Sequence, residues 1–372
     1  MLVISIVPRL FPVIDGVGDY ALQLAQQLRK DFSIETHFIV GDPNWNGSTK
    51  IEGFPIDKLP LRSALELSSL LLNCCPNSTI VLLHYVGYGY ATKGCPFWLI
   101  EGLEHWKANT VNTELVTMVH ELHPSGDPPW RINFWLSWLQ KHLAARIARL
   151  SDRCLTNRQS DVKALYNLSR GKHTQIPTLP VFSNIGEPKS LPSLSERQRR
   201  LVVFGQENSR LRVYQKSLKQ LSQACQVLGI EEIWDIGPSI KLNLAAVSEV
   251  PIVKIGKISA SEVSDIMLNS SAGFFNYDIS RLSKSGIFAA YCSHKLLPIS
   301  YHYGASSFDG IEAGKHYWVP ESEHLSVKSA AELQAIADNA YTWYQNHNLS
   351  VQAKTFAKSL GGNLITQSGE RN

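Results

Sequence analysis

Short apolar runs alternate with amphipathic stretches along the first half of the chain. Runs rich in Val, Ile and Leu are typical of buried strands, whereas apolar residues three or four positions apart predict helices. The predicted strands are 2–7, 34–40, 79–84, 115–119 and 154–156, and the predicted helices are 18–30, 61–73, 96–107 and 131–150. Alternation of this kind predicts βαβ units around a parallel sheet.

The alternation restarts after a proline-rich segment, 177–193, which we interpret as a linker. The predicted strands of the second half are 201–204, 233–236, 252–254, 272–276 and 296–299, and two helices follow at about 329–346 and 350–360. Capping-box spacings mark two helix starts, at Ser259 with Glu262 and at Ser329 with Glu332. We therefore predict an α/β fold class, with two Rossmann-like, doubly wound parallel-sheet domains that face a cleft.

Length and composition agree with two domains. The chain has 372 residues, of which 44% are hydrophobic and 18% charged, and its net charge is +4. We place an N-terminal domain at 1–180 and a C-terminal domain at 181–345. We expect residues 346–372 to form a final helix and a tail. One alternative is that this helix crosses back to the N-terminal domain. The mild charge does not indicate a nucleic-acid partner.

Several classes of protein are disfavoured by the same composition. No apolar run reaches the roughly 18 to 20 residues of a membrane span, and the first apolar run has the length of a strand rather than of a signal peptide. The six cysteines are scattered without a CxxC pair, which favours a reducing cytoplasm and argues against zinc. The expected localisation is cytoplasmic.

A glycine motif, Gly16-Val-Gly18, precedes the first predicted helix. Glycine turns that enter helices bind anions, because unpaired amides and the helix dipole point at the ligand. The motif also matches a dinucleotide fingerprint formally, with Glu35 downstream, but eight residues separate it from the strand, which disfavours a nicotinamide or flavin enzyme. We favour a phosphate-binding loop, and a tight turn with no ligand is the alternative.

Two histidines end predicted strands, at the edge of a parallel sheet where ligands bind. His120 is our candidate catalytic residue, because an imidazole there can bond a ligand hydroxyl or share a proton. We assign Asp19, His84, Tyr85 and Glu121 to a ligand pocket, with core packing as the alternative for His84 and Tyr85. The segment HELH at 120–123 is one residue shorter than the zincin motif HExxH, so no metal is expected.

Basic residues of the second half form two candidate phosphate sites. Arg210, Arg212 and Lys216 lie at the start of a helix after the strand 201–204, where they can bind phosphate oxygens or remain solvated helix charges. Lys284 and Ser285 precede Gly286 at a predicted helix start, which offers a cation, a hydroxyl and amide dipoles.

The predicted helix 131–150 carries an apolar stripe that we assign to the core: Ile132, Trp135, Leu139, Leu143, Ile147 and Leu150. Phe134 and Trp138 lie off this stripe, near several cations. Such a face can contact an anionic membrane surface, so peripheral membrane contact through 130–150 is considered, although packing against a neighbouring loop is favoured.

Three segments, 82–106, 115–140 and 282–294, resemble conserved regions of family-four, retaining glycosyltransferases of the GT-B fold. The resemblance implies a hexosyltransferase-type enzyme in which the C-terminal domain binds a nucleotide-sugar donor and the N-terminal domain presents a sugar or lipid acceptor. Gly16 and Gly18 would then lie beside the donor diphosphate, and His120 would contact the donor sugar. The ligand pocket of Asp19, His84, Tyr85 and Glu121 would be an acceptor or sugar pocket. No permanently bound cofactor and no obligatory metal are implied.

One region departs from that family. Its members carry two glutamates eight positions apart, whereas 276–294 contains no glutamate, and the matching places fall near Ser280 or Arg281 and near Ala289. A catalytically silent sugar- or nucleotide-binding partner in a polysaccharide assembly system is therefore the alternative function, and a Rossmann oxidoreductase is a third.

Overall fold

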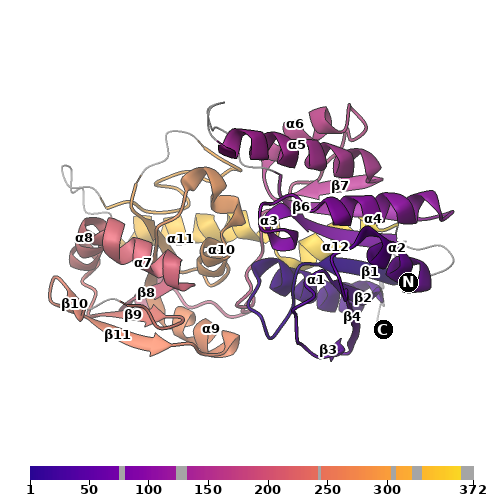
Figure 1. Cartoon of the computed structure of the whole chain (residues 1–372). Coiled ribbons are helices and arrows are strands. Elements are labelled where there is room, and N and C mark those ends of the chain that lie inside the picture. Colours follow the sequence, from indigo (N-terminus) through magenta and orange to yellow (C-terminus); the bar gives the residue numbers. More distant parts are fainter. Residues whose placement is uncertain (75–79, 123–131, 242–243, 303–306, 321–328, 362–372) are drawn as a thin grey trace, which may run out of the picture. The chain divides into compact units, whose positions relative to one another are not determined.

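The computed structural model describes residues 1–74, 80–122, 132–241, 244–302, 307–320 and 329–361, without the side chains of 132–134. These residues group into two compact units (Figure 1). Unit 1 contains residues 1–179 together with the chain from Leu349 onwards, and unit 2 contains Pro180–Asn348.

Unit 1 is built on a seven-stranded sheet in the order β3-β4-β2-β1-β5-β6-β7. Its strands are β1 (Leu2–Val7), β2 (Glu35–Val40), β3 (Lys50–Ile51), β4 (Phe54–Lys58), β5 (Ile80–Val86), β6 (Glu114–Glu121) and β7 (Arg153–Thr156). Its helices are α1 (Gly16–Phe32), α2 (Ala64–Cys74), α3 (Gly87–Tyr90), α4 (Phe97–Ala108), α5 (Ile132–Leu150), α6 (Gln159–Leu168) and α12 (Leu349–Ser359). The described pairings are parallel except for β3 with β4.

Unit 2 repeats this plan with a six-stranded sheet, β10-β11-β9-β8-β12-β13, in which β10 and β11 are antiparallel. Its strands are β8 (Gln198–Phe204), β9 (Glu232–Ile236), β10 (Ala246–Val247), β11 (Val250–Gly256), β12 (Ser270–Phe275) and β13 (Leu297–Ser300). Its α-helices are α7 (Glu207–Lys216), α8 (Leu218–Leu228), α9 (Ala260–Leu268), α10 (Gly286–Ser293) and α11 (Ala330–Gln345), and its short 3₁₀ helices are η1 (Leu194–Glu196) and η2 (Ile279–Lys284).

The predicted fold class is confirmed, since each unit is a doubly wound, mostly parallel sheet with helices on its faces. The predicted strand 2–7 coincides with β1, and the other predicted strands overlap observed ones. Both predicted capping boxes form, with Ser259 and Ser329 each bonded reciprocally to the glutamate three residues later. The sequence pattern does not indicate β3, β4 or β10. β3 and β10 are two-residue edge strands, too short for a clear pattern, and β4 lies between β3 and β2.

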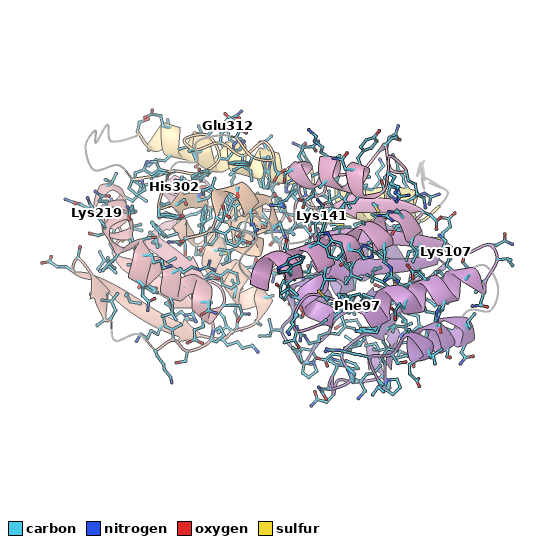
Figure 2. All side chains as sticks on the ribbon, turned by 45° about the horizontal axis from the view of Figure 1, so that its top comes forward. Phe97, Lys107, Lys141, Lys219, His302 and Glu312 are labelled. Atoms are coloured by element: carbon cyan, nitrogen blue, oxygen red, sulfur yellow. The ribbon has the colours of Figure 1, made fainter. Side chains whose placement is uncertain are left out.

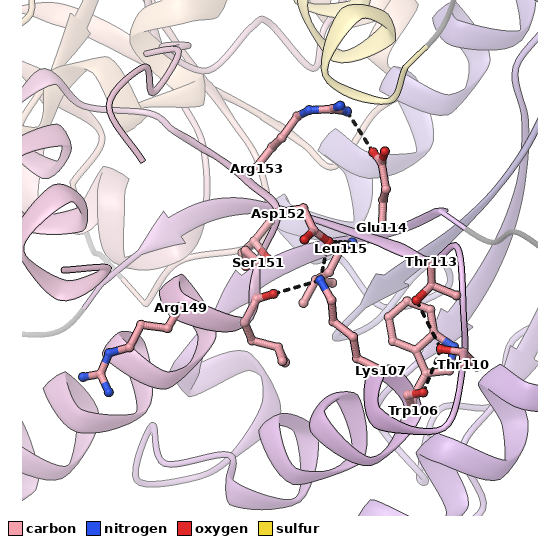
Figure 3. Close-up of polar contacts among 12 residues, drawn as sticks. Trp106, Lys107, Thr110, Thr113, Glu114, Leu115, Arg149, Ser151, Asp152 and Arg153 are labelled. Carbon is pink, nitrogen blue, oxygen red and sulfur yellow. Dashed lines mark hydrogen bonds and ion pairs between the residues drawn. The ribbon is translucent and has the colours of Figure 1, made fainter. Parts of the chain in front are cut away.

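Polar contacts fix the amino ends of β6 and β7 in unit 1. Lys107 of α4 donates to the carbonyl of Leu150 (3.1 Å) and pairs with Asp152, which also accepts from the amide of Leu115 at 2.8 Å (Figure 3). Arg153 and Glu114 pair at 2.9 Å beside them. This end of the sheet is thereby held by its own ion pairs, and the opposite, carboxyl end carries the candidate site.

Candidate functional site

The first helix of unit 1 begins at the glycine motif and is capped by the residue before it. Asp15 has an extended backbone, and its Oδ1 accepts hydrogen bonds from the amides of Val17 (3.0 Å) and Gly18 (3.1 Å). A carboxylate in this position satisfies amides that have no partner within the helix. The anion at this turn is therefore the side chain of Asp15 itself.

The two glycines of the motif differ in what the backbone requires. A Cβ on Gly18 would lie 2.1 Å from the carbonyl oxygen of Arg9, so the helix start can approach the preceding loop only without a side chain. A Cβ on Gly16 would meet no atom within 4 Å. Gly18 thus has a structural role in the turn, while phosphate binding by either glycine stays a prediction.

Acidic side chains predominate around this turn. Arg9 donates to Asp15 (Nε to Oδ2, 3.2 Å) and lies 3.7 Å from Asp42. Asp19 follows in the first turn of α1, where burial and the charge of Asp15 raise its pKa to about 6. A diphosphate that bound the amides of Val17 and Gly18 would have to displace one carboxylate and approach another.

His84 and His120, predicted for different roles, form one hydrogen-bonded pair. They lie near the carboxyl ends of β5 and β6, which are neighbours in the sheet. Nδ1 of His84 is 3.0 Å from Nε2 of His120, and the two rings are stacked with their centroids 5.3 Å apart. Burial lowers the pKa of His84 to about 3, so its ring is neutral near pH 7.

Tyr20 of helix α1 packs against this pair, and helix α12 contacts Tyr20. The ring of Tyr20 meets both imidazoles edge-on, with centroid distances of 5.9 Å to His84 and 5.1 Å to His120. The Tyr20 hydroxyl donates to Oε1 of Gln352 at 2.5 Å, which joins α1 to α12. The histidine pair is therefore enclosed on this side by an aromatic ring that is itself held in place.

Tyr85 and Glu121, predicted to line a pocket with His84, have different surroundings. Tyr85 lies in the hydrophobic core, 1% exposed, because adjacent residues of a strand face opposite sides of the sheet. Glu121 ends β6 and is half-buried. The HELH segment has its first two residues on this strand, which lacks the helical geometry of a zincin site, and His123 lies outside the described residues.

Arg210 of unit 2 is 1% exposed and has protein partners at all three guanidinium nitrogens. Nε donates to the carbonyl of Gly205 at 2.8 Å, and the other two nitrogens contact Asp235 and the carbonyl of Pro238. Asp235 also accepts from the hydroxyl of Tyr214 at 2.8 Å. Phosphate binding by Arg210 would require this buried network to open.

A pocket of about 430 Å³ lies at the carboxyl ends of strands in unit 2. Arg212 and Lys216, both exposed, reach it from α7, which follows β8, and the other lining residues follow β12 and β13. The lining is Arg212, Lys216, Asn276, Asp278, Ile279, Ser280, Tyr301, His302 and Phe308 (His302 is labelled in Figure 2). Because the strand order reverses between β8 and β12, this edge is where doubly wound sheets bind ligands.

Of the described lining residues, the sequence predicted Arg212 and Lys216 as phosphate ligands, whereas Asp278, Tyr301, His302 and Phe308 were among those without a predicted role. The available signal was position, since Asp278, Tyr301 and His302 lie within three residues after the ends of predicted strands. Asp278 is the one carboxylate among the described lining residues, and its Oδ1 accepts from the amide (3.0 Å) and hydroxyl (2.7 Å) of Ser280. The pocket therefore combines cations, aromatic rings and one acid.

Lys284 and Ser285 stand further along the same segment. Ser285 is the N-cap of α10, where its Oγ accepts from the amide of Phe288 at 3.2 Å, and it is buried. Lys284 ends η2 and is half-buried, whereas the described lining of the pocket includes only the first two residues of η2. Donor contact by Lys284 and Ser285 stays a prediction.

The prediction for the apolar stripe of α5 is wrong at Trp135, which is 65% exposed. Burial is concentrated in the second half of the helix, at residues such as Leu143 and Ile147, because α4 and α6 contact that half through Arg146 and Arg149. The side chains of Ile132 and Phe134 lie outside the described residues. No helix in the described ranges combines the length and apolar character needed to cross a membrane.

One group of metal-ligand atoms occurs elsewhere among the described residues. His37 Nε2, Asp57 Oδ2 and Cys74 Sγ lie within 4.8 Å of one another. The imidazole is 2.9 Å from the carboxylate oxygen, and the thiol donates to the same oxygen at 3.7 Å. Because the imidazole and the thiol both contact the same carboxylate oxygen, an ion pair and a hydrogen bond explain why the three side chains lie together.

No family model matches this chain, and no curated protein matches its sequence. Solved structures match over nearly the whole length. The pneumococcal O-GlcNAc transferase GtfA in complex with UDP and GlcNAc has a TM-score of 0.58 and 10% identity, covering 97% of this chain and 98% of that one. A putative UDP-N-acetylglucosamine 2-epimerase from Listeria monocytogenes has a TM-score of 0.58 and 12% identity, covering 97% and 95%.

An α-glucosyltransferase in complex with UDP and a 13-mer DNA has a TM-score of 0.54 and 11% identity, covering 97% of this chain and 99% of that one. At such identities the likeness concerns the fold, and the epimerase among these structures shows that the fold is compatible with more than one reaction. The chain has the two-domain GT-B fold of these glycosyltransferases, as its sequence predicts.

Proposed function

We propose that this chain is a glycosyltransferase that takes a sugar from a nucleotide-sugar donor, with the pocket of unit 2 as its donor site. The observation that carries the proposal is the presence of Arg212 and Lys216 in a pocket at the carboxyl edge of a doubly wound sheet. Two matching structures, GtfA and the α-glucosyltransferase, are complexes with UDP, which supports the same ligand class here.

The lining residues suit the parts of a nucleotide. Arg212 and Lys216 are assigned to the diphosphate, because guanidinium and ammonium groups bind phosphate oxygens by charge-assisted hydrogen bonds. Tyr301 and Phe308 offer ring faces to the base, and Asp278 offers acceptors to ribose hydroxyls. In this assignment Asp278 supplies the carboxylate that a glutamate supplies in the family that this chain resembles.

The chemistry of the proposed reaction is mainly electrostatic. As the glycosidic bond breaks, negative charge develops on the departing nucleoside diphosphate, and fixed cations and amides stabilise it. We assign this role to Arg212 and Lys216, with Lys284 and Ser285 as further donor contacts. His120 contacts the donor sugar, and the reaction proceeds with retention and without an obligatory metal.

The acceptor is a sugar or a lipid. Trp135 and Trp138 are exposed on the first half of α5, and Lys141, labelled in Figure 2, is exposed one turn further on. Aromatic rings beside cations suit an anionic bilayer surface. The ring of Trp138 also stacks on His142 with centroids 5.9 Å apart, so this face has partners within the chain as well. Co-sedimentation with anionic vesicles decides whether the lipid acceptor remains in the proposal.

One observation favours a second candidate, a silent binding partner in polysaccharide assembly. The segment 276–294 lacks glutamate, and Ala289, one of the places that match the family's pair, is a buried apolar residue. A protein that binds a nucleotide sugar through Arg212 and Lys216 without transferring it fits the same pocket. Binding is therefore common to both candidates, and turnover separates them.

The first experiment is thermal unfolding with UDP, GDP, ADP, TDP and NAD, each with and without magnesium. A ligand at a hundredfold its Kd stabilises by about 2.7 kcal/mol, which raises the midpoint by several degrees. We expect one nucleoside diphosphate to act selectively, followed by sugar release in a donor-hydrolysis assay. Stabilisation without turnover supports the binding partner, stabilisation by NAD alone supports an oxidoreductase, and no shift with any diphosphate contradicts the donor site.

A further inference from the structure

The pair of His84 and His120 determines where the hydrogen atoms of both rings lie. The bond joins Nδ1 of His84 to Nε2 of His120, so one of these nitrogens donates and the other accepts. His84 is completely buried, and its Nε2 has no hydrogen-bond partner among the described residues. The two arrangements of hydrogen therefore differ in what they leave unpaired inside the protein.

If Nε2 of His120 donated, neutral His84 would carry its own hydrogen on Nε2, as a buried N–H without an acceptor. If Nδ1 of His84 donates, only a lone pair remains unpaired at that place. Orphaned buried N–H groups are rare, and unsatisfied acceptors are less so. The second arrangement is favoured, and it puts the hydrogen of neutral His120 on Nδ1.

The surroundings of His84 keep this arrangement constant. Burial lowers the pKa of His84 to about 3, so it does not take up a second proton near neutral pH. Tyr20 packs edge-on against both rings, and its bond to Gln352 restrains it. The carboxyl ends of β5 and β6 hold the two backbones side by side in parallel register.

We propose that His84 is a positioning residue that fixes His120 in the tautomer with hydrogen on Nδ1, and that this is the form in which His120 acts in the proposed reaction. This inference rests on the proposed function for the role of His120, but the tautomer itself does not. Nothing in the sequence spacing of 84 and 120 indicates the pairing, which depends on the neighbouring strands.

The direct test is nitrogen NMR of protein labelled at histidine, with the signals of His120 assigned from a His120→Gln variant. We expect His120 to show a protonated Nδ1 and an unprotonated Nε2 near pH 7, whether or not the protein has transferase activity. A protonated Nε2 on His120 overturns the proposal. Because this readout needs no substrate, it is independent of the failure or success of the proposed function.

Variants of His84 supply the second test, in a transferase assay. In His84→Asn the amide nitrogen occupies nearly the place of Nδ1 and can still donate, whereas His84→Leu removes the donor. By analogy with residues that orient ligating histidines, we expect kcat to fall about 10- to 100-fold in His84→Leu with KM nearly unchanged, and to recover in large part in His84→Asn.

His347→Leu is the matched control. His347 is another buried histidine whose pKa burial lowers to about 3, and it belongs to unit 2 rather than to the unit of the histidine pair. We expect it to lower the unfolding temperature as much as His84→Leu does, with kcat unchanged. An equal loss of kcat in both variants, or no recovery in His84→Asn, shows that only packing is at stake and overturns the positioning role.

Discussion

The two units place opposite charges at the same point of the same fold. In each unit the first strand of the doubly wound sheet leads into a helix, β1 into α1 and β8 into α7. At the start of α1 the amides are bonded to Asp15, and Asp19 adds a second carboxylate. At α7 the acid Asp235 is paired with the buried Arg210, and Arg212 and Lys216 line a pocket.

A helix start after the first strand of a doubly wound sheet is therefore not by itself an anion-binding site. Amides at a helix start attract any nearby carboxylate, and a side chain tethered one residue away reaches them first. Among the described residues of unit 2, the one buried acid has its own arginine, and Arg212 and Lys216 line the pocket.

The largest effect is expected for Arg210→Met. Removing the guanidinium leaves Asp235 buried without its cation, and breaking such a pair costs about 3 to 5 kcal/mol of the free energy of unfolding. Urea titration of the wild type and the variant measures this change. A second substitution, Asp235→Asn in the Arg210→Met background, should restore part of the stability because it removes the unpaired charge. A loss below about 1 kcal/mol in Arg210→Met would show that Arg210 is not the structural arginine described here.

A smaller effect, on affinity rather than on folding, is expected for Arg212→Ala. A hydrogen bond to a charged group contributes about 1.5 to 3 kcal/mol, so UDP should bind at least about tenfold more weakly by calorimetry. The unfolding temperature should not change, because Arg212 is exposed.

Lys219→Ala is the control for that measurement. Lys219 is an exposed cation on the next helix, α8, and is not among the described residues of the pocket lining (Figure 2). Its replacement should leave UDP affinity unchanged. If both variants weaken binding alike, the effect is one of net charge, and the pocket is not the diphosphate site.

Asp15→Ala tests the acidic turn of unit 1. Loss of an N-cap costs about 1 kcal/mol of stability, which thermal unfolding detects. Affinity for UDP should stay the same if the diphosphate binds only in unit 2. Tighter binding by the variant would mean that the freed amides of Val17 and Gly18 accept the diphosphate, which would restore the role predicted for the glycine motif.

The smallest effect is a change in pH dependence at Asp19. Its pKa in the folded protein, about 6, lies above the ordinary value of 3.8, so the folded state favours the protonated form. This contribution to stability is present below pH 4 and is lost as the pH rises through 6. Asp19→Asn should therefore gain stability relative to the wild type between pH 4 and pH 7. The prediction is wrong if the urea-unfolding midpoints of the two proteins change with pH in the same way across this range.

The sequence predicted regular structure well where burial repeats along the chain. Residues 2–7 form a strand that is buried from Val3 to Val7, and this local run of mostly apolar residues is sufficient to predict it. The exposure of Trp135 was not predictable, since the helical stripe continues beyond the part of α5 that α4 and α6 cover.

For the site, the sequence indicated types of residue but not their partners. In the sequence, Arg210 does not differ from other cations on a predicted helix. Its role depends on the ion pair with Asp235, which lies on the strand β9. His84 and His120 were each recognised at a strand end, but their bond depends on the order of strands in the sheet. The role of Asp15 as the N-cap of α1 could have been predicted, because aspartate directly before a helix is a preferred N-cap.

The return of α12 to unit 1 has a consequence for the order in which the protein is made. Unit 2 is continuous in sequence, but Gln352, which holds Tyr20, leaves the ribosome only after all of unit 2 has been synthesised. Until then Tyr20, which packs against the histidine pair, lacks its contacts with α12. A nascent chain that stops before residue 349 thus contains a complete unit 2 and an unfinished unit 1, so the part that is translated first is completed last.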